Sequence, residues 1–344
     1  MIITTELLQI LVYIVFVFSI VAYATLDGFD LGVGSLHLFA KGDNERRLMI
    51  NAIGPVWDGN TTWIVIGAGV LFAGFPKVFY TIMAGFYTLV MVLLFAFMLR
   101  GAAIEFRSKQ TGKKWRNIWD FCFFFSSLLL ALDAGIILGN LIQGVPLNLQ
   151  GEVQGGFSIL VRPYPILIAF FALSIFLMHG SIYLLMKTEG HMHNRIRIWV
   201  RRLIVIFLVM WAITTVSTFM YNQHMVRPFF KHPVLCIFGV ISICLIAAIP
   251  YAIYKKKDGW AFIFSCCSIF SLLILFAIGT FPNIIYSTID PDQNTLTLFN
   301  SSVTRKALVV LVIVALSGTP LAIFYGSYIH KVFKGKVKLD HMSY

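Results

Sequence analysis

Long apolar stretches, separated by charged or Pro- and Gly-rich breaks, recur along the whole chain. About 20 consecutive apolar residues suffice for a helix to cross the hydrocarbon core of a bilayer. The roughly ten-residue segments of alternating apolar and polar positions that mark a membrane β-barrel are absent. The pattern therefore predicts nine transmembrane helices, at approximately residues 7–36, 52–74, 78–99, 118–142, 163–186, 203–221, 234–254, 260–281 and 307–330.

Composition supports the same class. Hydrophobic residues make up 59% of the 344 residues and charged residues only 12%, whereas a soluble globular domain carries about 25% charged residues. The chain has too little charge to cover a water-facing surface, which excludes a soluble protein. Residues 1–344 are expected to form a single integral membrane domain with an all-α polytopic fold.

The basic residues indicate an orientation for these helices. Twenty-one of the 27 Lys and Arg residues fall in the loops after the first, third, fifth and seventh predicted spans and in the C-terminal tail. Cytoplasmic loops hold the excess of Lys and Arg in membrane proteins. We therefore expect the N-terminus outside and the C-terminus in the cytoplasm. The net charge of +12 then records membrane orientation, and no nucleic-acid partner is expected.

Ligands for metals and redox cofactors are scarce. The five cysteines all fall in or at apolar spans, without the CxxC or Cys/His spacing of a metal site, and are expected to be packing residues. Haem iron needs axial ligands such as His, Met or Cys. Of eight histidines only His179 lies well inside a predicted span, and nothing singles out any of the twelve methionines. The chain is expected to bind no metal and no redox cofactor and to hold no catalytic residue.

Candidate chemistry lies in the ionisable residues inside the spans, since such residues are costly in a membrane and usually face a cavity or a partner. In the first span, Asp27 and Asp30 are three residues apart and share a helix face. In the second span, Asp58 is placed about two turns from the cytoplasmic end. Five further polar residues are expected at the same level or near the middle: Arg100, Glu105, Asp120, Asp133 and His179.

Two interpretations stay open for these groups. A carboxylate cluster on the cytoplasmic side would suit a proton-uptake path, because protons move along titratable groups and water. The same acids would equally serve to cap broken helices or to hold helix contacts. Asp120 and Glu105, near the membrane surface, are expected to be solvated or paired with Arg116 and Arg107. His179 is expected to make a helix contact rather than to bind a ligand.

Several segments of the chain form a distinctive set when they are taken in order. They are 23–34 (YATLDGFDLGVG), 54–60 (GPVWDGN) with Trp63, 99–107 (LRGAAIEFR), Trp119 with Asp120, 139–144 (GNLIQG), His179 with Gly180, 187–190 (KTEG) and 259–262 (GWAF). Together they resemble the signature segments of subunit II of the cytochrome bd family of quinol oxidases. The match runs in order over nearly the whole chain, and the Asp-Gly-Phe-Asp and Trp-Asp-Gly-Asn segments are highly specific in combination.

The resemblance implies a heterodimer of the bacterial inner membrane that oxidises quinol, reduces O₂ to water, and adds to the proton gradient by taking protons from the cytoplasm. In that family haem b, haem d and the quinol-oxidising loop belong to the larger subunit I, so the isolated chain is expected to be inactive. The resemblance also implies two four-helix bundles plus one peripheral helix. A small third subunit, and a structural quinone or lipid on this chain, are left open.

For individual residues, the resemblance implies that Asp27 and Asp58 line a hydrophilic channel at the subunit interface that leads protons toward haem d. It also implies that Trp63 lies near the oxygen access route. We expect Asp27 and Asp58 to relay protons while further polar residues shape or hydrate the path, namely Asp30, Asn60, Arg100 and Glu105. Many members carry Glu directly after the Trp-Asp-Gly-Asn segment, where this chain has Thr61, so no role of that carboxylate is transferred.

Two other classes of function stay open on the residues alone. A secondary transporter would also place acids at helix breaks near Gly and Pro, as in 28–34 and 54–59, but should show paired inverted halves and work as a single gene product. A purely structural assembly subunit would make the same contacts without any step that depends on titration.

Overall fold

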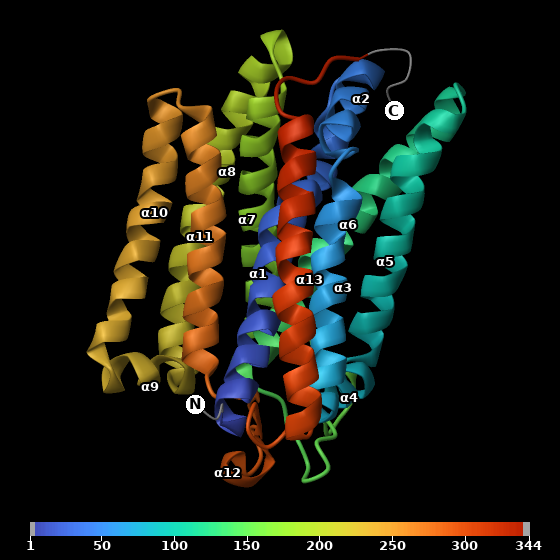
Figure 1. Cartoon of the computed structure of the whole chain (residues 1–344). Coiled ribbons are helices and arrows are strands. Elements are labelled where there is room, and N and C mark those ends of the chain that lie inside the picture. The colour runs from blue at the N-terminus through green and yellow to red at the C-terminus, as the bar shows by residue number, and fades with distance from the viewer. Residues whose placement is uncertain (1–3, 340–344) are drawn as a thin grey trace.

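The computed structural model describes residues 4–339, most of which form long helices that run side by side and are joined at the two ends of the bundle (Figure 1). Within this part of the chain, eight helices are long and apolar enough to cross a membrane. A ninth span results if α3 (Trp57–Gly74) and α4 (Pro76–Gly85), which are bent by 118° against each other, are taken as one. The all-α polytopic class is therefore confirmed, with eight or nine candidate spans.

The eight membrane-length helices are α1 (Thr5–Leu36), α5 (Tyr87–Phe106), α6 (Lys113–Gln143), α7 (Pro163–Lys187), α8 (Gly190–Tyr221), α10 (Cys236–Tyr254), α11 (Asp258–Thr280) and α13 (Arg305–Val332). Shorter helices connect them: α2 (Gly42–Ile53), α9 (Gln223–Lys231), α12 (Pro291–Asn294), and the 3-10 turns η1 (His37–Phe39), η2 (Arg107–Lys109), η3 (Phe157–Ile159) and η4 (Pro233–Leu235). Between α11 and α13, the short strands β1 (Asn283–Ile285) and β2 (Leu296–Thr297) pair in an antiparallel manner.

The second predicted span, 52–74, is divided in the structure. α2 ends at Ile53, α3 begins at Trp57, and a turn that contains Pro55 separates them. A proline removes one helical hydrogen bond and clashes with the preceding turn, which favours a break at this point. Asp58 consequently lies in the first turn of α3 and not two turns inside one continuous helix.

The third predicted span, 78–99, begins too early in the sequence. Residues 76–85 form the separate short helix α4, which lies at the lower end of the bundle, and the membrane helix α5 begins at Tyr87 (Figure 1). Pro76 is the first residue of α4, a position at which proline is favoured because its missing N–H would be unpaired anyway. Hydropathy did not separate the two helices because both are apolar.

α1 is the central helix of the bundle. It packs against α3, α6, α7, α11 and α13, and its residues from Asp27 to Leu36 are buried without a break. α1 and α7 approach most closely where Gly32 meets Gly180, since a Cβ atom on Gly32 would lie 1.8 Å from the backbone oxygen of Phe176. Small residues permit this close approach of two helices, and the contact holds Asp27 and Asp30 in the interior.

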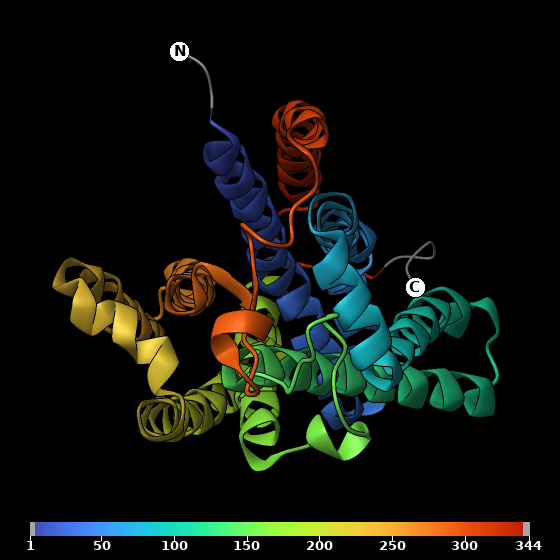
Figure 2. The ribbon, with the colours of Figure 1, turned by 90° about the horizontal axis from the view of Figure 1, so that it is seen from below.

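The other spans flank α1 on two sides. α8, α10 and α11 lie to one side of it, and α3 and α5 lie to the other (Figures 1 and 2). α13 stands at the rim against α1 and α3, and Leu308 is its one buried residue in the described chain. The loops that carry most of the Lys and Arg residues lie together at the end of the bundle where α2 is found (Figure 1).

Candidate functional site

A buried ion pair joins α1 to α5. The guanidinium of Arg100 donates two hydrogen bonds to the carboxylate of Asp27, one of 2.9 Å from Nη1 and one of 2.7 Å from Nη2. Arg100 is 1% exposed and Asp27 is fully buried. A two-point contact of this kind is the strongest geometry for an Arg–carboxylate pair, and it engages both oxygens of Asp27.

Thr61 on α3 completes this arrangement. Its hydroxyl oxygen accepts a 2.8 Å hydrogen bond from Nη2 of Arg100 and lies 3.3 Å from Oδ1 of Asp27. It also donates to the backbone oxygen of Trp57 at 2.8 Å. Position 61 therefore holds a hydroxyl in direct contact with the ion pair.

Asp30 lies one helical turn beyond Asp27 and is also fully buried. Its Oδ2 accepts a 2.8 Å hydrogen bond from the side-chain amide of Asn60, which also donates to the backbone oxygen of Leu26 at 3.3 Å. Oδ1 of Asp30 has no hydrogen-bond partner among the described residues. Buried polar atoms without a partner are uncommon and mark places where a water molecule or a proton can be held.

The buried cluster on α1, α3 and α5 therefore contains two carboxylates and one guanidinium. We define it by its five residues: Asp27, Asp30, Asn60, Thr61 and Arg100. With both carboxylates ionised it carries one uncompensated negative charge. An unpaired charge is costly in a dry interior, and Asp30 has no cation of its own within the cluster.

Other residues expected at the site lie outside this cluster. Asp58 is exposed on the surface of α3. Trp63 is 4% exposed and packs edge-on against Phe18 of α1, with 5.6 Å between the ring centroids. Glu105 is half-buried in the last turn of α5. The structure therefore brings only part of the expected site together in the buried cluster, and Asp58, Trp63 and Glu105 lie apart from it.

His179 on α7 ties three helices together. Its Nδ1 lies 2.7 Å from the hydroxyl of Ser265 on α11, and its Nε2 lies 3.0 Å from the backbone oxygen of Thr25 on α1. The ring stacks on Phe262 with 5.0 Å between centroids. Both ring nitrogens are engaged, so the side chain makes a helix contact and offers no free nitrogen to an iron atom.

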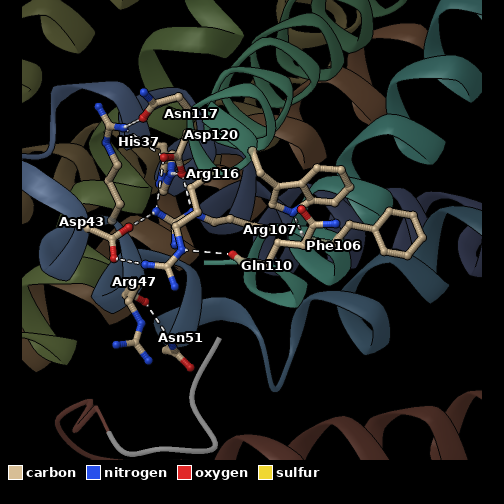
Figure 3. A network of polar contacts seen from close by, with 12 residues as sticks. His37, Asp43, Arg47, Asn51, Phe106, Arg107, Gln110, Arg116, Asn117 and Asp120 are labelled. Atoms are coloured by element: carbon tan, nitrogen blue, oxygen red, sulfur yellow. Dashed lines mark hydrogen bonds and ion pairs between the residues drawn. The ribbon is translucent and has the colours of Figure 1, made fainter. Parts of the chain in front are cut away.

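A second polar network lies at the end of the bundle that carries α2 (Figure 3). Asp120 on α6 is at its centre and contacts His37 and Arg107, each at 2.5 Å, and Arg46 at 2.9 Å. Asp120 was expected to be solvated or paired with one of two arginines, Arg107 and Arg116; it is buried and pairs with Arg107. Arg116 contacts Asp43 at 2.6 Å.

Sequence reasoning missed two features of these sites. Thr61 departs from the pattern that the resemblance implies, although its place next to Asn60 in the second predicted span could have indicated a contact. The participation of His37 and Arg46 in the Asp120 network left no signal in the sequence, because these residues are brought to Asp120 only by the packing of η1 and α2 against α6.

Metal-binding side chains are not grouped in the part of the chain that the structure describes. No group of three or more His, Cys, Asp or Glu side chains in residues 4–339 is arranged to hold a metal ion. His179, the histidine expected well inside a span, uses both nitrogens in hydrogen bonds.

Comparison with known proteins identifies the family. A family model described as cytochrome bd terminal oxidase subunit II matches residues 8–333. The chain belongs to this family. Two curated relatives of this bd oxidase subunit agree with the match over 96% of both chains: the cytochrome bd ubiquinol oxidase subunit 2 of Bacillus subtilis, with 31% identity, and the cytochrome bd-I ubiquinol oxidase subunit 2 of Escherichia coli K12, with 28% identity.

The fold of a solved bd oxidase agrees as well. One chain of the bd oxidase from Geobacillus thermodenitrificans superposes with a TM-score of 0.78 at 16% identity, over 95% of this chain and 98% of that chain. The resemblance inferred from the signature segments is thus confirmed. The apolar helices and these relatives imply a multi-pass protein of the bacterial inner membrane with a general role in a terminal oxidase.

Proposed function

We propose that this chain is the haem-free subunit II of a heterodimeric quinol oxidase and forms part of the path that delivers cytoplasmic protons to O₂ reduction. The larger subunit I would carry haem b, haem d and the quinol site. The N-terminus would lie outside and the C-terminus in the cytoplasm. The two four-helix bundles would be built around α1 and α7, with α13 as the peripheral helix.

The observation that carries this proposal is the exposure of Asp58 on a helix of a membrane protein. Acidic residues within membrane spans face a partner, a cavity or water and not lipid. The exposed side of α3 continues from Asp58 through Thr62 and Val65 to Gly69, and a Cβ atom on Gly69 would meet nothing within 4 Å. Such a surface of polar and small residues suits close packing against a helix of subunit I.

Within the path, the three acids have different roles. Both oxygens of Asp27 are held by Arg100, so we assign Asp27 to fixing the charge and shape of the cluster. Asp30 keeps one oxygen without a partner and lies beside an uncompensated charge, so we assign it the transferable proton. Asp58 would collect protons at the subunit interface. The relay role expected for Asp27 thereby passes to Asp30, while that of Asp58 is kept.

Glu105, Asn60 and Trp63 have supporting roles in the proposal. Asn60 orients Asp30 through its amide. Glu105 would hydrate the path near the end of α5. An oxygen-access role for Trp63 rests on the family resemblance alone, since its buried ring packs within this chain against Phe18.

Quinol oxidase turnover of the purified heterodimer tests the proposal. Asp58→Asn and Asp30→Asn remove the titrating group with little change in size, and each should lower O₂ consumption at least tenfold with unchanged haem spectra, since positioned proton transfer contributes about 10²–10⁴-fold. Asp292→Asn, in the exposed helix α12, is the matched control and should leave turnover unchanged.

The outcome also separates the proposal from the purely structural alternative. Wild-type turnover in both path variants, with haems fully assembled, would contradict a proton path through this chain. Loss of haem absorbance in both variants would instead assign these acids to assembly. Purification without any haem-bearing partner, and transport of a solute by this chain alone, would favour the secondary transporter.

A further inference from the structure

A basic cavity lies between the start of α2 and the start of α6. Its volume is about 430 Å³, and its charged lining is formed by Arg46, Lys113, Arg116 and Asp43. Figure 3 shows part of this region, where Arg116 and Asp43 lie beside the Asp120 network. None of these residues belongs to the buried cluster on α1, α3 and α5, so the cavity is a separate feature of the molecule.

The charges around the cavity do not balance. Arg46, Arg107, Arg116 and Lys113 supply four positive charges, against the two carboxylates of Asp43 and Asp120 with which the arginines pair. Nε of Arg46 is buried and has no hydrogen-bond partner among the described residues. The excess of donors and of positive charge fits an anion with several acceptor oxygens, such as a phosphate group.

The start of α6 adds to the same preference. α6 begins at Lys113, which lines the cavity, and its first turn has no acidic residue and no side-chain hydrogen bond from its N-cap. The N-terminus of a helix carries partial positive charge and exposed N–H groups, so the start of α6 favours a bound anion next to the basic side chains. The start of α2 differs, because Glu45 accepts a hydrogen bond from the backbone N–H of Lys41 there.

An apolar surface continues from the cavity along α6 toward the membrane interior. Asn117 lines the cavity, and Phe121, one turn further along, is 55% exposed. Phe121 stacks on Phe125, with 5.8 Å between ring centroids. Trp115 and Trp119 pack edge to face nearby, with 5.6 Å between ring centroids, and tryptophan is enriched at membrane interfaces. A basic cavity that opens onto an apolar helix face matches a phospholipid better than a free anion.

We propose that this cavity binds the headgroup phosphate of an anionic phospholipid whose acyl chain lies along Phe121 and Phe125. Lys113, Arg46 and Arg116 supply the charge, and Asn117 supplies a neutral hydrogen-bonding group. Juxtamembrane basic residues attract anionic lipids in this way. The site does not depend on the proton path, because it shares no residue with that path.

Lipid retention by the purified heterodimer tests this site. Complexes prepared in nanodiscs of mixed phosphatidylglycerol and phosphatidylcholine are released into mild detergent, and native mass spectrometry counts the bound lipids. The wild type should retain phosphatidylglycerol in preference to phosphatidylcholine. Lys113→Gln should weaken this retention about fivefold, while Lys114→Gln, which removes the same charge at an adjacent exposed position outside the cavity, should leave it unchanged.

Two further measurements distinguish a bound phospholipid from a bound free anion. Phe121→Ala should weaken phosphatidylglycerol retention although it alters no charge, and millimolar inorganic phosphate should not displace the lipid. Equal losses in Lys113→Gln and Lys114→Gln would mean general surface charge and would overturn the site. Displacement by inorganic phosphate, or equal retention of both lipids by the wild type, would overturn the proposal as well. Haem spectra report whether each variant has folded.

Discussion

Arg100 on α5 holds both carboxylate oxygens of Asp27 on α1, at 2.9 and 2.7 Å, inside the membrane domain. The two side chains are 1% and 0% exposed, so water does not screen their attraction. The pair therefore fixes α1 and α5 to each other. It also places a positive and a negative charge at fixed positions one helical turn from Asp30.

Removal of one partner from this pair should be more damaging than removal of both. Arg100→Gln leaves the carboxylate of Asp27 buried without its cation, and breaking a buried pair in this way costs about 3–5 kcal/mol. We expect the thermal midpoint of haem loss from the heterodimer to fall in Arg100→Gln and to recover partly in the double variant with Asp27→Asn. An Arg100→Gln complex as stable as the wild type would show that the pair does not hold the helices.

His179 should prove structural when its hydrogen bonds are removed. His179→Phe keeps the stacking on Phe262 and loses the bonds to Ser265 and to the backbone of Thr25, which should lower stability by about 1–3 kcal/mol. The visible spectrum of the oxidase should keep all haem bands. Loss of one haem band with an otherwise intact complex would identify His179 as a ligand and contradict this assignment.

The contact between α1 and α7 should not tolerate a side chain at Gly32. Gly32→Ala would place Cβ 1.8 Å from the backbone oxygen of Phe176, and backbone atoms cannot move away as a flexible side chain could. We expect little or no assembled heterodimer in membranes, measured by the haem d band. Gly239→Ala on α10, where a Cβ would meet nothing within 4 Å, is the matched control. Normal assembly of Gly32→Ala would show that the two helices are less closely packed.

Much of the fold could be predicted because the membrane imposes a strong length constraint on apolar helices. Every predicted span overlaps a helix of the structure. The errors fall at Pro55 and at residues 75–86, where a short helix interrupts or adjoins a span. Hydropathy averages over about 20 residues and does not resolve a break of one to three residues within an apolar region.

The candidate site could be predicted only in part. Asp27 and Asp30 stand out as costly residues inside a span, Arg100 as a charge at the end of one, and Asn60 through the family resemblance; the structure brings all four together. Nothing in the sequence reveals that Arg100 pairs with Asp27 and not with Asp30, because this choice depends on how α5 rotates against α1. The exposure of Asp58 likewise follows from the packing of α3 and not from its sequence.

Proton uptake during a single turnover tests the central claim most directly. The reduced heterodimer is mixed with O₂ in the presence of a pH-indicating dye, which follows the protons taken from solution as O₂ is reduced. In Asp30→Asn and Asp58→Asn the account predicts proton uptake slowed at least tenfold, with O₂ binding to the haem at the wild-type rate and Asp292→Asn unaffected. Proton uptake at the wild-type rate in both path variants would contradict the account.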